Sequence, residues 1–139
     1  MPEDSRPAEI HISFHIRGFE DSPTVITNIL GIKPTSVHAR GERRGSKGGI
    51  YRENVWALDA DSSQIEDVES GVRQLVKRLE IAKDKFVRLP QGSVLDLCCG
   101  ISILDGPSGP PLTIDRHSTK FLGEIGASID IDIYCLEND

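Results

Sequence analysis

The chain has 139 residues, the size of a single domain, and its 37% hydrophobic and 27% charged residues are a globular rather than a disordered composition. Its net charge of −6 argues against nucleic acid and anionic membranes as partners, because phosphates would repel it. No apolar run could cross a membrane, no signal peptide is evident, and three cysteines cannot form a complete set of disulfides, so we expect a cytoplasmic protein. We expect a disordered tail at residues 1–8 and one α+β domain at residues 9–136.

The first part of the chain predicts a strand and then a helix. Residues 9–17 alternate strictly between polar and apolar side chains, which is typical of a strand with one buried face. Ser22 and Pro23 fit the N-cap and first position of a helix, and Gly31 fits its end. The polar face of the strand carries His11, Ser13, His15 and Arg17.

Two further strands are predicted, a weak one over residues 35–40 and a stronger one over residues 50–59. The loop between them, residues 41–49, is rich in glycine and in basic side chains. Trp56 lies in the stronger strand, and its neighbours do not decide whether it faces the core or the outside.

The second half of the chain predicts two helices and two strands. Ser63 and Glu66 form a capping-box pattern, from which we expect a helix that ends near Leu79. Residues 93–104 predict an alternating strand, and residues 115–125 predict a shorter helix. The last strand, residues 127–134, should place Ile129, Ile131 and Ile133 on the core face and Asp130, Asp132 and Tyr134 on the other.

This order of elements predicts an α+β fold. The first six elements match a ferredoxin-like βαββαβ unit, to which a C-terminal helix and strand are added. Because most of the strands alternate, helices should cover one face of a mostly antiparallel sheet and leave the other face exposed, as in a two-layer sandwich. We call the uncovered side the open face.

Three stretches of the sequence resemble one bacterial family. They are SPTVITNILGIKPT at residues 22–35, WAL at residues 56–58 and GASIDIDIY at residues 126–134, of which the last is the most specific. The chain resembles, from about residue 12 to residue 134, the bacterial family catalogued as domain of unknown function 4279. The resemblance implies a small bacterial cytosolic domain, and it implies no activity, cofactor or catalytic residue.

Candidate functional residues gather on the open face. Imidazole and carboxylate groups together can hold a ligand or a metal ion, or transfer a proton, and His11 or His15 should lie beside Asp96 on the neighbouring strand. The alternative interpretation is that such cross-strand pairs only stabilise the sheet. The candidates for a ligand site or an interface are His11, His15, Arg17, Trp56, Asp96, Asp130, Asp132 and Tyr134.

The glycine-rich loop has a local charge opposite to that of the whole chain. Its glycines would let backbone amides turn toward an anion, although the order Gly45-Ser46-Lys47 is not that of a Walker loop. The alternative is a mobile connection that its charges keep soluble. The candidates for an anion-binding loop are Arg40, Arg43, Arg44 and Lys47.

No catalytic motif such as Gly-x-Ser-x-Gly occurs in the sequence. We therefore expect a non-enzymatic binding or protein-interaction module that uses the open face, without a cofactor. The alternatives are a small-ligand or metal-binding domain, or an unrecognised enzyme, that uses the His and Asp residues of that face. We also expect a homodimer or a protein partner, with Arg17 and His15 of one copy facing Asp130 and Asp132 of the other.

Overall fold

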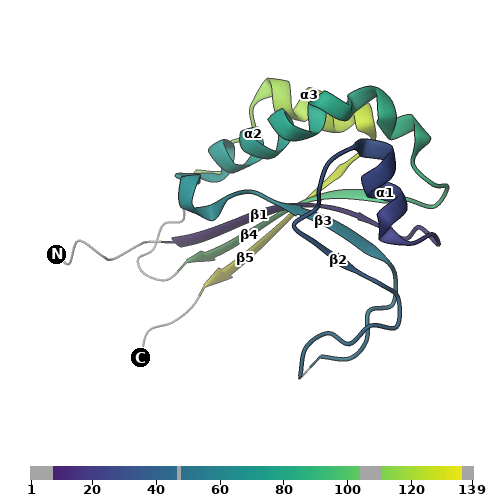
Figure 1. Ribbon diagram of the computed structural model, residues 1–139. Coiled ribbons are helices and arrows are strands. Elements are labelled where there is room, and N and C mark those ends of the chain that lie inside the picture. Colours follow the sequence, from purple (N-terminus) through teal and green to yellow (C-terminus); the bar gives the residue numbers. More distant parts are fainter. Residues whose placement is uncertain (1–7, 47, 104–110, 136–139) are drawn as a thin grey trace.

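The computed structural model describes residues 8–46, 48–103 and 111–135. It is an α+β fold in which three helices cover one side of a five-stranded mixed sheet (Figure 1). Residues 1–7 of the expected tail lie outside the described residues, and Ala8 already belongs to the first strand. The strands are β1 (Ala8–Arg17), β2 (Ser36–His38), β3 (Val55–Asp59), β4 (Val94–Ile103) and β5 (Ser128–Cys135). The helices are α1 (Pro23–Leu30), α2 (Val68–Leu79) and α3 (Arg116–Ile125), with the short 3-10 helices η1 (Ser62–Gln64) and η2 (Glu80–Arg88).

The strands lie in the order β2-β3-β1-β4-β5. The pairings of β2 with β3, β3 with β1 and β1 with β4 are antiparallel, and that of β4 with β5 is parallel. The register confirms the predicted faces, because it sets His15 opposite Asp96 and Cys98 opposite Asp130. The sheet therefore has an apolar face under the helices and a polar open face on the other side.

Trp56 belongs to the core, so its inclusion among the candidate interface residues is wrong. It lies opposite Ile16 in the register and is fully buried. Its indole Nε1 donates a hydrogen bond of 3.0 Å to Thr27 Oγ1 in α1, which satisfies the only polar atom of the side chain. The ring thus joins β3 to the helix layer.

Helix α2 begins later than the capping box at Ser63 and Glu66 predicts. Residues 62–64 form η1, and the N-cap of α2 is Asp67. Asp67 Oδ1 accepts a hydrogen bond of 2.8 Å from the Ser70 amide, and Ser70 Oγ accepts one of 3.2 Å from the Asp67 amide, so this pair forms the capping box. Of the predicted apolar stripe, Val68, Val72, Leu75 and Leu79 are buried in α2, whereas Ile65 precedes the helix and is only partly buried.

Strand β5 lies at the edge of the sheet and is exposed along its whole length. Ile131 pairs with Cys99 and points to the helix side, as expected, yet it is 42% exposed. The expectation of a packed core position is wrong, since β4 is the only described strand beside β5 and an edge strand buries less of its side chains. Ile129 and Ile133 are similarly exposed, at 36% and 50%.

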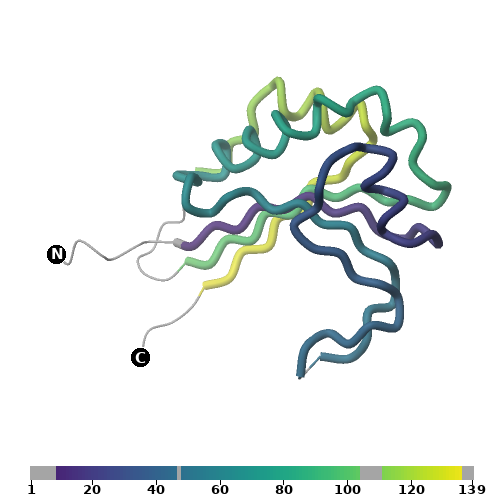
Figure 2. The backbone as a smooth tube through the Cα atoms, viewed as in Figure 1, coloured from purple at the N-terminus to yellow at the C-terminus, as the bar shows by residue number. Residues whose placement is uncertain are grey.

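The connection between β2 and β3 leaves the sheet on the side away from the helices (Figures 1 and 2). Backbone hydrogen bonds hold its two arms together, with the Gly41 amide donating to Tyr51 O and the Tyr51 amide to Glu42 O, both at 2.8 Å. The strand predicted over residues 50–59 therefore begins within the sheet only at Val55. We call residues 39–54 the hairpin. No helix in the described ranges is long and apolar enough to cross a membrane.

Candidate functional site

The hairpin and the open face enclose a cleft of about 560 Å³, which we call the hairpin cleft. β1, β2 and β3 form its floor, and the hairpin forms its wall. The lining residues are His11, His15, Ser36, His38, Arg44, Ile50, Tyr51, Arg52, Glu53, Val55, Ala57 and Asp59. Three imidazoles from two strands thus face a single concave surface.

His15 is half-buried in the floor of the cleft. Its Nε2 lies 3.0 Å from Ser13 Oγ, and its Nδ1 lies 3.7 Å from Cys98 Sγ. Burial lowers the pKa of His15 below its ordinary value of 6.5, although the nearby carboxylates of Asp59 and Asp96 act in the opposite direction. The imidazole is therefore held mainly in its neutral form at neutral pH.

Asp96 is the most buried carboxylate of the open face, with its side chain 7% exposed. It lies opposite His15 in the register, but its hydrogen-bonding partner is Arg17, whose Nε donates to Asp96 Oδ2 at 2.7 Å. Arg17 also donates to Glu53 Oε1 at 3.2 Å, and the hydrogen bond with Asp96 raises the pKa of Arg17. Both candidates are thus engaged within the chain, which leaves Asp96 little capacity to bind a ligand.

The nucleophilic side chains near His15 are poorly placed for catalysis. Ser13 is only 2% exposed, so a substrate has little access to its hydroxyl. Burial, followed by the charges of Asp96 and Asp130, raises the pKa of Cys98 from 9.0 to about 11. Since the thiolate is the reactive form of cysteine, Cys98 is less nucleophilic here than an ordinary thiol at neutral pH.

The hairpin contributes an aromatic stack that the sequence analysis missed. The rings of His38 and Tyr51 stack with centroids 4.1 Å apart and an interplanar angle of 12°, and the Arg44 guanidinium lies 5.2 Å from the Tyr51 centroid. His38 lies in a weak strand, so its sequence position did not single it out. Asp59 also lines the cleft without having been predicted. The sequence signal for the stack is an aromatic residue, Tyr51, just after a basic, glycine-rich loop.

The four basic candidates of the loop have separate positions. Arg44 lines the hairpin cleft, whereas Arg40 lines a neighbouring cleft of about 310 Å³, in which Arg52 also takes part. Arg43 is exposed, and its backbone pairs with Ile50 across the hairpin. Lys47 lies outside the described residues.

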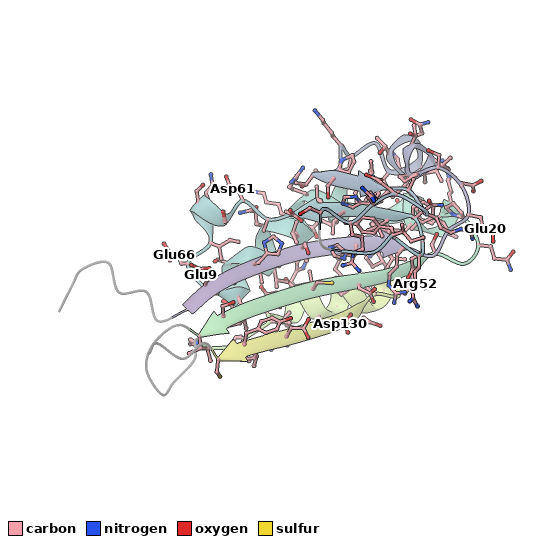
Figure 3. The ribbon with its side chains drawn as sticks, turned by 90° about the horizontal axis from the view of Figure 1, so that it is seen from below. Glu9, Glu20, Arg52, Asp61, Glu66 and Asp130 are labelled. Atoms are coloured by element: carbon pink, nitrogen blue, oxygen red, sulfur yellow. The ribbon has the colours of Figure 1, made fainter. Side chains whose placement is uncertain are left out.

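Asp130, Asp132 and Tyr134 belong to the open face but not to the cleft. All three are exposed on β5, the strand farthest from β2 in the sheet. Figure 3 views the sheet from below, with Asp130 on β5. Arg52 lies near one end of the sheet, and the arrowheads of β4 and β5 lie at the other end. Within the described part of the chain, no group of three or more His, Cys, Asp or Glu residues is arranged to hold a metal ion.

Comparison with known proteins agrees with the resemblance found in the sequence. The family model described as "Domain of unknown function (DUF4279)" matches residues 8–136. No curated protein matches the chain, and no solved structure matches it. Because the matched region covers nearly the whole sequence, the chain belongs to the DUF4279 family.

Proposed function

We propose that this domain is a non-enzymatic binding module that receives part of a ligand or partner in the hairpin cleft. The observation that carries the proposal is a concave site of about 560 Å³ that combines imidazole, guanidinium and phenol groups. This volume lies within the usual range of about 300–1,000 Å³ for ligand sites. These side chains donate and accept hydrogen bonds around one space, which is what fixes the orientation of a bound group.

The alternative of an enzyme on the same face has weaker support. A nucleophile must be accessible and activated, whereas Ser13 is buried and the pKa of Cys98 is raised to about 11. Asp96, which lies opposite His15 in the register, is paired with Arg17. These side chains therefore favour binding over covalent or acid–base chemistry.

The strand order β2-β3-β1-β4 supports the proposal that the first six elements form a ferredoxin-like unit, with α3 and β5 added at the edge. The three cysteines are free thiols, which supports a reducing, cytoplasmic location.

An NMR titration tests the binding function. ¹⁵N-labelled protein is titrated with small carboxylates, phosphates, amines and neutral aromatic compounds. We expect saturable shifts that cluster at His11, His38 and Tyr51, and we expect Tyr51→Ala to weaken them. Val87→Ala is a matched control, because Val87 is 86% exposed in η2, on the helix side of the sheet. Shifts that gather around Val87, or that occur nowhere, would contradict the proposal.

A further inference from the structure

In the described part of the hairpin, the arginine side chains form no ion pair with an acidic residue. Residues 40–53 contain five basic residues and two acidic ones, in a chain whose net charge is −6. Glu53 is paired with Arg17 of β1, and Glu42 accepts a hydrogen bond of 2.9 Å from the Ala39 amide. Over the ranges that the structure describes, Arg44 and Arg52 form no ion pair. Their charges thus remain available to a ligand.

Arg44 and Arg52 both line the wall of the hairpin cleft. Arg44 rests near the ring of Tyr51, and Tyr51 in turn stacks on His38 of β2. A cation–π contact orients a guanidinium but does not neutralise it. This stack therefore restrains Arg44 before any ligand arrives, which lowers the entropy cost of binding.

Two carboxylates line the cleft, that of Glu53 in the hairpin, which is paired with Arg17, and that of Asp59. Asp59 lines the cleft at the far end of β3, four residues beyond Val55, where the hairpin joins the strand. Four residues of a strand span roughly 13 Å, so Asp59 is well separated from the root of the hairpin. Among the described lining residues at the hairpin end, the one carboxylate, that of Glu53, is thus engaged by Arg17, whereas the two arginines of the wall form no ion pair.

We infer that the hairpin end of the cleft binds an anionic group, a phosphate or a carboxylate, through the guanidinium groups of Arg44 and Arg52. The inference rests on the proposed binding function and names the chemistry of the ligand. Planar guanidinium groups suit both anions, because their N–H groups can donate two parallel hydrogen bonds to a pair of oxygens. His38 and Tyr51 supply further hydrogen-bonding groups at the same end.

The test is a titration of the full chain with inorganic phosphate and, separately, with acetate, both at constant ionic strength set with sodium chloride. We expect saturable shifts of the Arg44 and Arg52 side-chain N–H signals for at least one of the two anions. Arg44→Gln and Arg52→Gln should each weaken binding roughly tenfold, as expected for the loss of a charge-assisted hydrogen bond. Arg78→Gln is the matched control, because Arg78 is exposed in α2 on the helix side.

Because Arg44 and Arg52 are exposed, we expect both variants to keep the fold, and a thermal melt of each variant checks this. Equal weakening by Arg78→Gln, or unchanged binding in both cleft variants, would overturn the anion site. If amines or neutral aromatics shift the cleft residues while phosphate and acetate do not, the anion chemistry fails and the binding function survives. If no probe shifts the cleft residues, the binding function itself fails.

Discussion

At the residue scale, His15 is the clearest pH-sensitive group. Burial lowers the pKa of His15 below 6.5, so the unfolded state takes up a proton at a higher pH than the folded state does. His15 therefore has no effect on the free energy of unfolding well above pH 6.5. As the pH falls through the interval below 6.5, the unfolded state binds more protons, and the free energy of unfolding falls.

We accordingly expect the free energy of unfolding to fall less in His15→Gln than in the wild type as the pH is lowered from about 7 to about 5. Urea denaturation at a series of pH values measures this difference. Ser13→Ala is the control, because it removes the hydroxyl near His15 Nε2 but keeps the imidazole. An identical pH dependence in His15→Gln and the wild type, or a His15 pKa at or above 6.5 by NMR, would show that burial does not dominate.

Cys98 provides a second prediction at the same scale. A pKa raised from 9.0 to about 11 lowers the thiolate fraction near neutral pH by about two orders of magnitude. We expect iodoacetamide to alkylate exposed Cys135 first and half-buried Cys98 far more slowly, as followed by mass spectrometry of peptides. Alkylation of Cys98 as fast as that of Cys135 would reopen the possibility of a catalytic thiol beside His15.

At the element scale, the contact between α2 and the sheet depends on Gly71. A Cβ at this position would lie 2.7 Å from Ile12 Cγ1, and Ile12 is fully buried at the centre of β1. We expect Gly71→Ala to destabilise the protein by about 1–3 kcal/mol, because overpacking outweighs the better helix propensity of alanine. Chemical denaturation measures the change.

Gly123 offers a matched control within α3. A Cβ there would meet nothing within 4 Å, so Gly123→Ala should stabilise the protein by about 0.5–1 kcal/mol through helix propensity alone. If both alanine variants shift the stability in the same direction, the close approach of α2 to Ile12 is not the cause.

The edge position of β5 predicts a difference between two isoleucines that both point to the helix side. Ile101 in β4 is 1% exposed, and Ile101→Ala should cost about 2–5 kcal/mol by leaving a cavity. Ile131 is 42% exposed, so Ile131→Ala should lower the free energy of unfolding by only about 1 kcal/mol. Equal losses in denaturant unfolding would mean that β5 is covered in solution.

Local signals were sufficient for part of the fold. Alternation identified the faces of β1 and β4, the N-cap and glycine signals located α1, and the helix predicted over residues 115–125 matches α3. The start of α2 could not be chosen from the sequence, because Ser63-x-x-Glu66 and Asp67-x-x-Ser70 both resemble capping boxes. In the structure α2 begins at Val68, which is fully buried in the core. That choice depends on tertiary packing, which a local pattern does not encode.

The candidate site was predictable to a similar extent. The open face and the opposition of His15 and Asp96 followed from strand order and alternation. The ion pair between Asp96 and Arg17 did not follow from them, because it depends on whether His15 or Arg17 of β1 reaches the carboxylate. The cleft itself was not foreseen, since no periodicity indicates the direction in which the hairpin leaves the sheet.

At the scale of the whole molecule, charge is distributed unevenly across the open face. The basic hairpin lies beside β2 and β3, and the exposed carboxylates of Asp130 and Asp132 lie on β5 at the opposite edge. Arg17 is already paired within the chain, so it is not the cation to expect in a contact between copies. We expect the exposed arginines of the hairpin, such as Arg43, to supply the cations of such a contact instead.

These charges complement each other if two open faces stack about a two-fold axis parallel to β1. Such an axis sets the β2 edge of one copy over β5 of the other, so each hairpin would flank the acidic strand of its partner. We therefore expect a homodimer, which light scattering at micromolar concentration would show as twice the chain mass of 15.3 kDa. Arg43 is separate from the anion site proposed in the cleft, so the two ideas are tested by different variants.

A charge swap gives the sharpest test of this assembly. Asp132→Arg should convert the dimer to monomer through repulsion between that arginine and the partner's basic hairpin, and adding Arg43→Glu should restore the dimer. Asp84→Arg is the matched control, because Asp84 is exposed in η2 on the helix side. A wild type that stays monomeric would remove the dimer. A dimer that survives Asp132→Arg would instead place its interface away from β5, because a buried like-charge contact of this kind opposes association strongly enough to be seen in the measured mass.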